Sequence, residues 1–220
     1  MQCIKDTIKN INIVIGCNIG CSYCYARMNN NRFHTIDDFN KPVFFENKLK
    51  MLDNKRYTAY LLTGQSDLSG WNEEWKDKVF SKMKENENTQ YIFLTKRPEN
   101  INLKETPDNG WFGVTVTSSK EKTRIDYLRN NIKAKHYHIT FEPMFDDVGK
   151  LDLNNISWIV IGTETGNRKG KISSKREWVF NIYNQAKEKN IPVFMKEDLL
   201  GILNEDEFVQ EFPKEFGGIK

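Results

Sequence analysis

Short apolar runs rich in β-branched and aromatic residues recur along the chain, and longer polar segments separate them. Runs of this length and composition predict buried strands. We expect about seven strands, at Ile11–Ile15, Tyr57–Thr63, Tyr91–Thr95, Trp111–Thr117, Tyr137–Phe141, Trp158–Gly162 and Pro192–Met195.

Several of the intervening segments have the period of amphipathic helices. In the clearest case Trp178, Ile182, Tyr183 and Ala186 recur at helical intervals among charged residues. The expected helices cover Glu73–Glu85, Lys120–Asn131 and Lys175–Lys189, with a further one from about Phe44 to Leu52. Strands that alternate with helices predict βαβ units, and therefore an α/β fold around a parallel sheet.

The number of units limits the architecture but does not settle it. Seven strand–helix units are too few for a closed eight-stranded barrel, so the choice lies between an incomplete, open barrel and a doubly wound sheet. No linker rich in Gly, Ser or Pro divides the chain. We therefore predict a single domain over residues 1–220, with a core at about 11–196 and a C-terminal extension over 197–220. The end of that extension, from Phe212 to Gly218, is expected to be a short tail that packs locally.

The charge is nearly balanced, because 33 Lys and Arg oppose 30 Asp and Glu to give a net charge of +3. This balance permits a nucleic-acid partner without indicating one. The apolar runs fall far short of the ~18 residues that a membrane span requires, and no secretory signal is visible at the N-terminus. We predict a cytoplasmic protein with no membrane partner.

All four cysteines lie among the first 24 residues, at positions 3, 17, 21 and 24. A disulfide framework would cross-link distant segments, so this clustering indicates a metal site instead. Cys17, Cys21 and Cys24 form a C-x3-C-x2-C motif directly after the first predicted strand. Three thiolates at this spacing can hold three corners of a [4Fe–4S] cluster and leave the fourth iron open to a small molecule.

Two other interpretations of the cysteines stay open. A structural zinc site would need a fourth ligand from Cys3, His34, His136 or His138, none of which stands at a fixed spacing from the motif. The chain would then be a zinc-stabilised binding module. Alternatively, the cluster is structural and the protein repairs or binds nucleic acid.

The cysteine motif, with Tyr23 before its third cysteine, resembles that of the radical S-adenosylmethionine superfamily. Further segments, in the same order, are similar to those of a small phage-associated radical S-adenosylmethionine family of unassigned function. These segments are Gly16–Arg27, Phe93–Asn100, Trp111–Val116, Phe141–Pro143 and Trp158–Gly166. The resemblance implies a partial (β/α)6-type TIM barrel, here with room for a seventh strand, that binds a [4Fe–4S] cluster and S-adenosylmethionine.

The activity implied by the resemblance is reductive cleavage of S-adenosylmethionine to a 5′-deoxyadenosyl radical, which abstracts hydrogen from a substrate. The enzyme would be an isomerase, a lyase or a related type. Its partners would be a small-molecule or nucleotide substrate, such as a modified nucleotide or DNA base, and an electron donor such as flavodoxin or ferredoxin. The cofactor would carry the difficult chemistry, while the protein positions and shields it.

The resemblance also implies where the cofactors bind, since parallel β/α folds place ligands at the carboxyl ends of their strands. Cys17, Cys21 and Cys24 would hold the cluster. The remaining candidate cofactor-binding residues are Tyr23, Gly64, Gln65, Asp67, Lys96, Arg97, Thr115, Thr117, Glu142 and Glu164. No catalytic residue is assigned.

Each candidate has a chemical reason. Gly64, Gln65 and Asp67 stand where the superfamily has a Gly-Gly-Glu-like segment for the methionine amino group, although the Glu is absent here. Lys96 or Arg97 would pair with the carboxylate of the methionine moiety or with substrate, with Arg124 as a rival cation. The hydroxyls of Thr115 and Thr117 suit ribose, and Glu142 suits ribose or substrate. The segment Ile161–Glu164 resembles the adenine-binding segment of the superfamily, which implies that Glu164 lines the adenine or substrate site.

Overall fold

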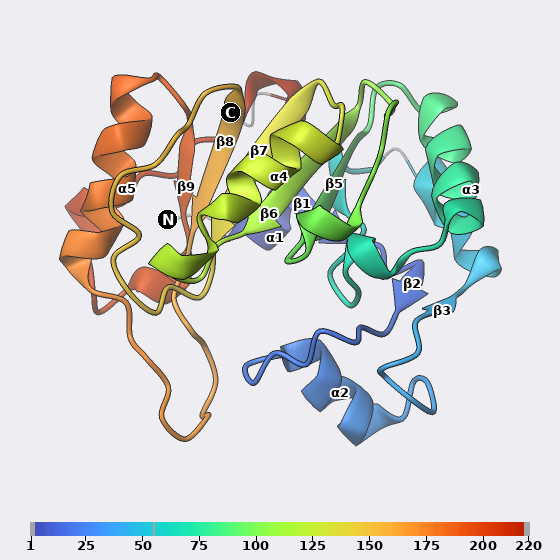
Figure 1. Ribbon diagram of the computed structural model, residues 1–220, viewed down its shortest axis with the longest axis horizontal. Helices are drawn as coiled ribbons and strands as arrows, with labels where there is room; N and C mark the ends of the chain where they lie inside the picture. Colours follow the sequence, from blue (N-terminus) through green and yellow to red (C-terminus); the bar gives the residue numbers. More distant parts are fainter. Residues whose placement is uncertain (1–2, 55, 218–220) are drawn as a thin grey trace.

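The computed structural model describes residues 3–54 and 56–217. Its main feature is an open sheet of seven parallel strands, whose spatial order β1-β4-β5-β6-β7-β8-β9 follows the chain (Figure 1). The strands are β1 (Ile8–Asn10), β4 (Ala59–Leu61), β5 (Gln90–Thr95), β6 (Gly110–Thr115), β7 (His136–Phe141), β8 (Ile156–Ile161) and β9 (Val193–Met195). A doubly wound sheet reverses its strand order, and this one does not, so the structure is an α/β fold with a curled half-barrel sheet.

Three of the predicted helices are confirmed, as α3 (Glu73–Lys84), α4 (Thr123–Asn131) and α5 (Arg176–Glu188). The helix predicted from Phe44 is a 3₁₀ helix over Glu46–Asp53. A short α1 (Ile4–Thr7) and α2 (Tyr25–Phe33) complete the α-helices, and brief 3₁₀ turns lie at Leu68–Gly70, Pro98–Asn100, Ser119–Glu121, Glu197–Leu199, Glu205–Glu207 and Lys214–Phe216. None of the helices in the described part of the chain is both long and apolar enough to cross a membrane.

The prediction that Ile11–Ile15 forms the first strand of the main sheet is wrong. Val14–Ile15 form β2, which pairs antiparallel with β3 (Val43–Phe44) in a separate two-stranded sheet. The first strand of the main sheet is instead Ile8–Asn10, which pairs parallel with β4. Ile11 and Ile13 are buried as their hydrophobicity predicts, but hydrophobicity does not say which strand a segment pairs with.

Helix α2 had no apolar signal in the sequence, because it is rich in Asn and buries only Ala26 and Asn30. It is held by polar contacts. The sulfur of Cys24 caps its first turn by accepting a hydrogen bond from the backbone N–H of Arg27 at 3.4 Å. The side chain of Asn30 donates to the carbonyl of Ile36 and accepts from its N–H, both at 3.0 Å, and so fixes the turn that follows the helix.

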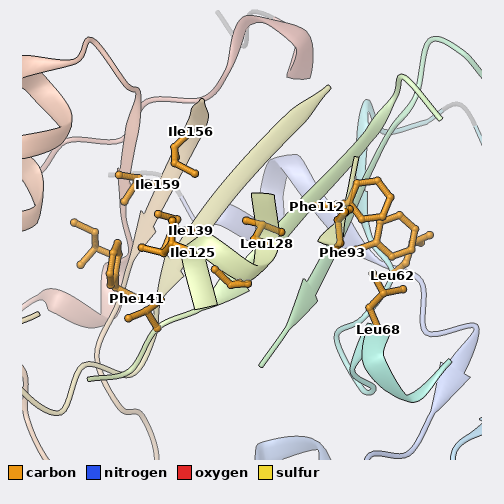
Figure 2. Packing of buried hydrophobic residues seen from close by; sticks show 14 of the residues in the cluster. Leu62, Leu68, Phe93, Phe112, Ile125, Leu128, Ile139, Phe141, Ile156 and Ile159 are labelled. Carbon is orange, nitrogen blue, oxygen red and sulfur yellow. The ribbon is translucent and has the colours of Figure 1, made fainter. Parts of the chain in front are cut away.

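Alternate residues of the strands pack against α3, α4 and α5 to form the larger core. Phe93 of β5 and Phe112 of β6 stack with ring centroids 4.9 Å apart, while Ile125 and Leu128 of α4 lie over the sheet near Ile139 (Figure 2). Burial of apolar surface contributes about 25 cal/mol per Å², and this cluster has more buried residues than the others, so it makes the largest hydrophobic contribution.

The opposite face of the sheet carries a second core, which contains Trp111, Trp158 and Phe194. Phe216 of the C-terminal extension is fully buried in it and packs edge-on to both tryptophans. The extension therefore belongs to the core of the domain, whereas we expected a tail packed locally. A run of apolar residues in a polar segment does not reveal that it docks on a sheet distant in sequence.

His138 of β7 is the register partner of Trp158, with the two ring centroids 6.0 Å apart, and is buried. Its Nε2 lies 3.1 Å from the carbonyl oxygen of Phe93, to which it donates. The ring occupies the space above Gly113, where a Cβ atom would come within 2.4 Å of it. Burial lowers the pKa of His138 to about 4, so the ring is neutral in the folded state near pH 7.

We expect this buried neutral ring to make stability fall with acid. The unfolded chain protonates His138 near its ordinary pKa of about 6.5, whereas the folded protein resists protonation until about pH 4. The free energy of unfolding should therefore drop by about 3 kcal/mol between those two pH values. Urea unfolding of the wild type and of His138→Gln across this range would measure the difference. The exposed His34 provides the control variant, His34→Gln. Parallel curves for wild type and His138→Gln would contradict the prediction.

Candidate functional site

The cysteine loop, residues 16–24, runs between β2 and α2 over the carboxyl end of β4. The N–H of Gly16 donates to the carbonyl of Gln65 at 3.0 Å, and Gly16 forms an isolated parallel bridge with Ser66. Gly16 has a φ of 114°, and a Cβ there would lie 2.9 Å from the Cα of Pro42. Only glycine suits this position without strain. The bond and the bridge made by Gly16 place the next residue, Cys17, directly at the edge of the sheet.

The first thiol of the loop is half-buried and lies near other acidic groups. Burial, with smaller contributions from negative charge at Asp67, Cys21 and Cys24, raises the pKa of Cys17 to about 11. The loop is folded back on α2, since the guanidinium of Arg27 donates to the carbonyl of Cys17 at 2.7 Å. In residues 3–54 and 56–217, no group of three His, Cys, Asp or Glu side chains is arranged to hold a metal ion.

The donor set nevertheless fits an iron–sulfur cluster, because it consists of three thiols on one loop and thiolates are the ligands that such clusters take. The fourth cysteine is not part of it: the sulfur of Cys3 donates to the carboxylate of Glu197 at 3.2 Å. Among the histidines considered as a fourth zinc ligand, His138 is buried in the core and bonded to Phe93.

Two tyrosines fasten the loop to other strand ends. The ring of Tyr23 packs edge-on to Phe145, beyond β7, at 5.4 Å, and the ammonium of Lys96, after β5, lies 5.8 Å from its centroid. Burial, reinforced by negative charge at Cys21, raises the pKa of Tyr23. Tyr25 at the start of α2 donates to the carbonyl of Gly64 at 2.5 Å. Sequence reasoning found Tyr23 but missed Tyr25, which stands directly after the third cysteine.

Asp67, predicted to contact the cofactor, is buried and fully engaged by the protein. Its carboxylate accepts from the N–H and hydroxyl of Ser69, from the hydroxyl of Thr95 at 2.6 Å, and from the N–H of Lys96 at 2.8 Å. The side chain therefore joins the loop after β4 to the end of β5. Gln65 likewise uses its backbone carbonyl to hold Gly16.

The next strand ends bring cations and hydroxyls together. The ammonium of Lys96 lies 3.5 Å from the hydroxyl of Thr115. The hydroxyl of Thr117 donates to Glu121 at 2.7 Å, and Arg124 both donates to the carbonyl of Thr115 and pairs with Glu121, each at 2.8 Å.

The charge at these ends is unevenly compensated. Within the described residues, Lys96 and Arg97 make no ion pair, whereas the rival cation Arg124 is neutralised by Glu121. Lys96 and Arg97 are therefore the cations at this part of the edge whose charge is not neutralised by an acidic side chain of the described residues.

A charged cluster closes the other side of the edge. The ammonium of Lys196, after β9, pairs with the carboxylate of Glu142, after β7, and with Asp198 at 3.3 Å. We call Glu142, Lys196 and Asp198 the carboxylate–lysine cluster. Burial works to lower the pKa of Lys196, but the two carboxylates raise it overall, and burial raises the pKa of Asp198 despite its lysine partner. Asp198 was not found from the sequence, because it follows the last strand within a short 3₁₀ turn.

Glu164, predicted to line the adenine or substrate site, is buried and already paired. Its carboxylate accepts from the guanidinium of Arg168 at 2.5 and 2.8 Å and from the N–H of Ile172 at 3.3 Å. These bonds lower the pKa of Glu164. The side chain organises the loop that follows β8 and has no oxygen left uncommitted to that loop.

Comparison with known proteins places the whole sheet and the cysteine loop in one family. A family model described as a protein of unknown function, DUF5131, matches residues 2–217. The chain belongs to the DUF5131 family. Because the match covers nearly all 220 residues, the sites at the carboxyl edge lie within the DUF5131 unit. No solved structure matches the chain.

The DUF5131 chain is also similar to part of Lipase 1 of Staphylococcus aureus. In strains N315 and COL, identity is 35% over 98 residues, which covers 44% of this chain and 14% of each lipase. The chain thus spans about a seventh of the length of these curated relatives. Its printed sequence contains no Gly-x-Ser-x-Gly segment, the turn that exposes the nucleophile in α/β-hydrolases.

Replacing Asp67 tests its position as a clamp. We expect Asp67→Ala to lower the free energy of unfolding by about 3 kcal/mol, because it removes several bonds to a charged acceptor and leaves buried donors unpaired. Asp77→Ala, on the exposed side of α3, is the matched control and should change stability by less than about 0.5 kcal/mol. Equal effects in urea denaturation would show that Asp67 is not the clamp.

Proposed function

We propose that this DUF5131 protein is a radical S-adenosylmethionine enzyme with one [4Fe–4S] cluster, built on a partial (β/α)6-type barrel extended by a seventh strand. The observation that carries the proposal is the position of three thiols on one loop at the carboxyl edge of a parallel sheet in sequential order. That edge is where β/α folds bind their ligands.

The chain supplies a suitable holder for the cluster. Gly16 lets the backbone turn tightly beside the first thiol, and Cys24 is fixed at the amino end of α2, where its sulfur accepts the N–H of Arg27. When bound, the cluster supplies the electron that splits the sulfonium bond of S-adenosylmethionine and so starts hydrogen abstraction from the substrate.

The uncommitted groups at the edge suit the rest of the cofactor. Lys96 and Arg97 have positive charge to offer a carboxylate, and a guanidinium matches its two oxygens best. Thr115 presents a hydroxyl beside Lys96. Asp67 and Glu164, by contrast, are consumed by internal hydrogen bonds, so we assign them to positioning the loops and not to holding the cofactor.

The carboxylate–lysine cluster supports a substrate contact on the far side of the edge. The side chain of Tyr25 is half-exposed, but its hydroxyl lies against the carbonyl of Gly64. Burial of that hydroxyl, followed by negative charge at Glu142, raises the pKa of Tyr25. The cluster therefore neighbours the cysteine loop while remaining at the end of β7 and β9. Its carboxylates can accept hydrogen bonds from a substrate while Lys196 keeps them in place.

Anaerobic purification with iron and sulfide tests the proposal. We expect a brown protein with absorbance near ~400 nm and about four irons per chain, because thiolate-bound clusters are coloured and zinc sites are not. The Cys17→Ser/Cys21→Ser/Cys24→Ser variant should lose the iron and the colour. Cys3→Ser is the control that removes a cysteine outside the motif, and it should keep both.

Activity is then measured as the dithionite-dependent release of 5′-deoxyadenosine from S-adenosylmethionine. Wild type and Cys3→Ser should release it, and the triple variant should not. A colourless protein with one zinc per chain would establish the zinc-stabilised module instead. An iron-loaded protein that never cleaves S-adenosylmethionine would leave the cluster without the proposed role and would refute the enzyme.

A further inference from the structure

Positive charge is concentrated in one segment after β8. Residues 163–176, which we call the basic loop, contain five of the 33 Lys and Arg but one of the 30 Asp and Glu. The segment has a net charge of +4, whereas the rest of the chain sums to −1. A near-neutral protein with its charge gathered in one loop has an electrostatic surface for a polyanion.

The shape of the basic loop is held by its own residues. Glu164, buried at its base, binds Arg168 through both carboxylate oxygens and also accepts from the N–H of Ile172. Ser174 closes the base, because its N–H and hydroxyl both lie 3.0 Å from the hydroxyl of Thr163. The acid of the loop therefore forms its ion pair with Arg168 and not with the other cations of the loop.

Three lysines of the loop are exposed, and no acidic side chain among the described residues pairs with them. In the part of the chain that the structure describes, Lys169, Lys171 and Lys175 form no ion pair. Arg176 differs, since it pairs with Glu207. Three uncompensated cations on a loop of fixed shape can contact successive phosphates.

The basic loop lies at the edge that carries the proposed site. It leaves the carboxyl end of β8 and projects beyond the same edge of the sheet as α2 (Figure 1). Its base also touches the carboxylate–lysine cluster, because the N–H of Thr163 donates to Asp198 at 3.1 Å. A polymer held by the loop is therefore beside the cluster and the cysteine loop.

Helix α2 adds exposed apolar and aromatic surface. Tyr25, Met28 and Phe33 are 51%, 55% and 65% exposed, and the guanidinium of Arg32 lies 5.1 Å from the ring centroid of Phe33. Aromatic rings beside cations are the surfaces on which unpaired bases stack. An acidic protein partner would use the lysines but has no such need for an exposed ring.

We propose that the basic loop binds the sugar–phosphate backbone of a single-stranded polynucleotide, whose bases reach α2 and the carboxyl edge of the sheet. The proposal rests on the proposed function in that it names the substrate class of that site. The binding step itself depends on the loop and α2 and not on a loaded cluster.

Fluorescence anisotropy of a labelled oligothymidylate of about 20 nucleotides tests it, with the anaerobically purified protein between about 50 and 200 mM salt. Three phosphate contacts each contribute about 0.7 to the slope of log K against log salt. Lys169→Gln/Lys171→Gln/Lys175→Gln should therefore flatten the slope by about 2 and weaken binding about tenfold or more at low salt.

The matched control removes the same charge elsewhere. Lys84, Lys104 and Lys214 are exposed, and Lys84 and Lys104 precede the amino ends of β5 and β6. Their triple Gln variant should keep most of the affinity and a slope close to that of the wild type. Equal losses in the two triple variants, or no binding by the wild type, would overturn the proposal.

Variants of Phe33 distinguish a nucleic-acid ligand from other polyanions. We expect Phe33→Ala to weaken oligothymidylate binding about fivefold or more, and Phe33→Tyr to restore it, because either aromatic ring can stack. If Phe33→Ala has no effect and polyglutamate competes as well as the oligonucleotide, the loop is a surface for an acidic protein and the proposal fails. A duplex that binds more tightly than the single strand would also overturn it.

The variant without Cys17, Cys21 and Cys24 distinguishes this failure from failure of the proposed function. It should still bind the oligonucleotide, because the three lysines and Phe33 remain. Retained binding in a wild-type protein that never cleaves S-adenosylmethionine would refute the enzyme alone. Cleavage without binding would refute the polynucleotide alone.

Discussion

The parallel direction of the seven strands is the constraint on which the candidate site depends. All the strands point the same way, so every loop after a strand emerges at one edge. Residues as distant in sequence as Gly64, Lys96, Glu142 and Lys196 are thereby brought to the same border of the sheet. The cysteine loop crosses this border. Gly16 bonds it to Gln65, and Tyr25, directly after the loop, bonds to Gly64.

Two kinds of polar group at this edge serve different purposes. Asp67 and Glu164 are buried and saturated by hydrogen bonds, so they fix the loops after β4 and β8. Lys96 and Arg97 are not paired in the described residues. A cation without an ion pair in the protein is available to pair with a negatively charged ligand. Such cations are therefore candidates for a binding site. The distinction explains why residue type alone was an incomplete guide to the site.

The carboxylate–lysine cluster and the basic loop extend the same edge away from the cysteines. Asp198 belongs to both, because it pairs with Lys196 and accepts the N–H of Thr163. The hydrogen bond from Thr163 to Asp198 thus connects the basic loop directly to the carboxylate–lysine cluster. This continuity makes the edge a single surface, with thiols at one part, a charged cluster beside them, and free lysines at its border.

The sequence by itself determined the elements with strong local patterns. Six strands of the parallel sheet, three amphipathic helices and the three-cysteine motif follow from hydrophobic period and spacing, which are properties of neighbouring residues. Tertiary structure decided the rest. Pairing made Ile8–Asn10 the first strand of the main sheet and β2 a partner of β3, and docking buried Phe216 between Trp111 and Trp158.

The same limit applies to the candidate site. The sequence could place Asp67, Glu142 and Glu164 after strands, where functional groups gather. It could not say which of these carboxylates would be occupied by hydrogen bonds and ion pairs within the protein. That depends on Ser69, Thr95, Lys196 and Arg168, whose donors reach those carboxylates only after the loops have folded. Contacts between distant segments leave no period in the chain, because their partners are selected by packing and not by spacing along the sequence.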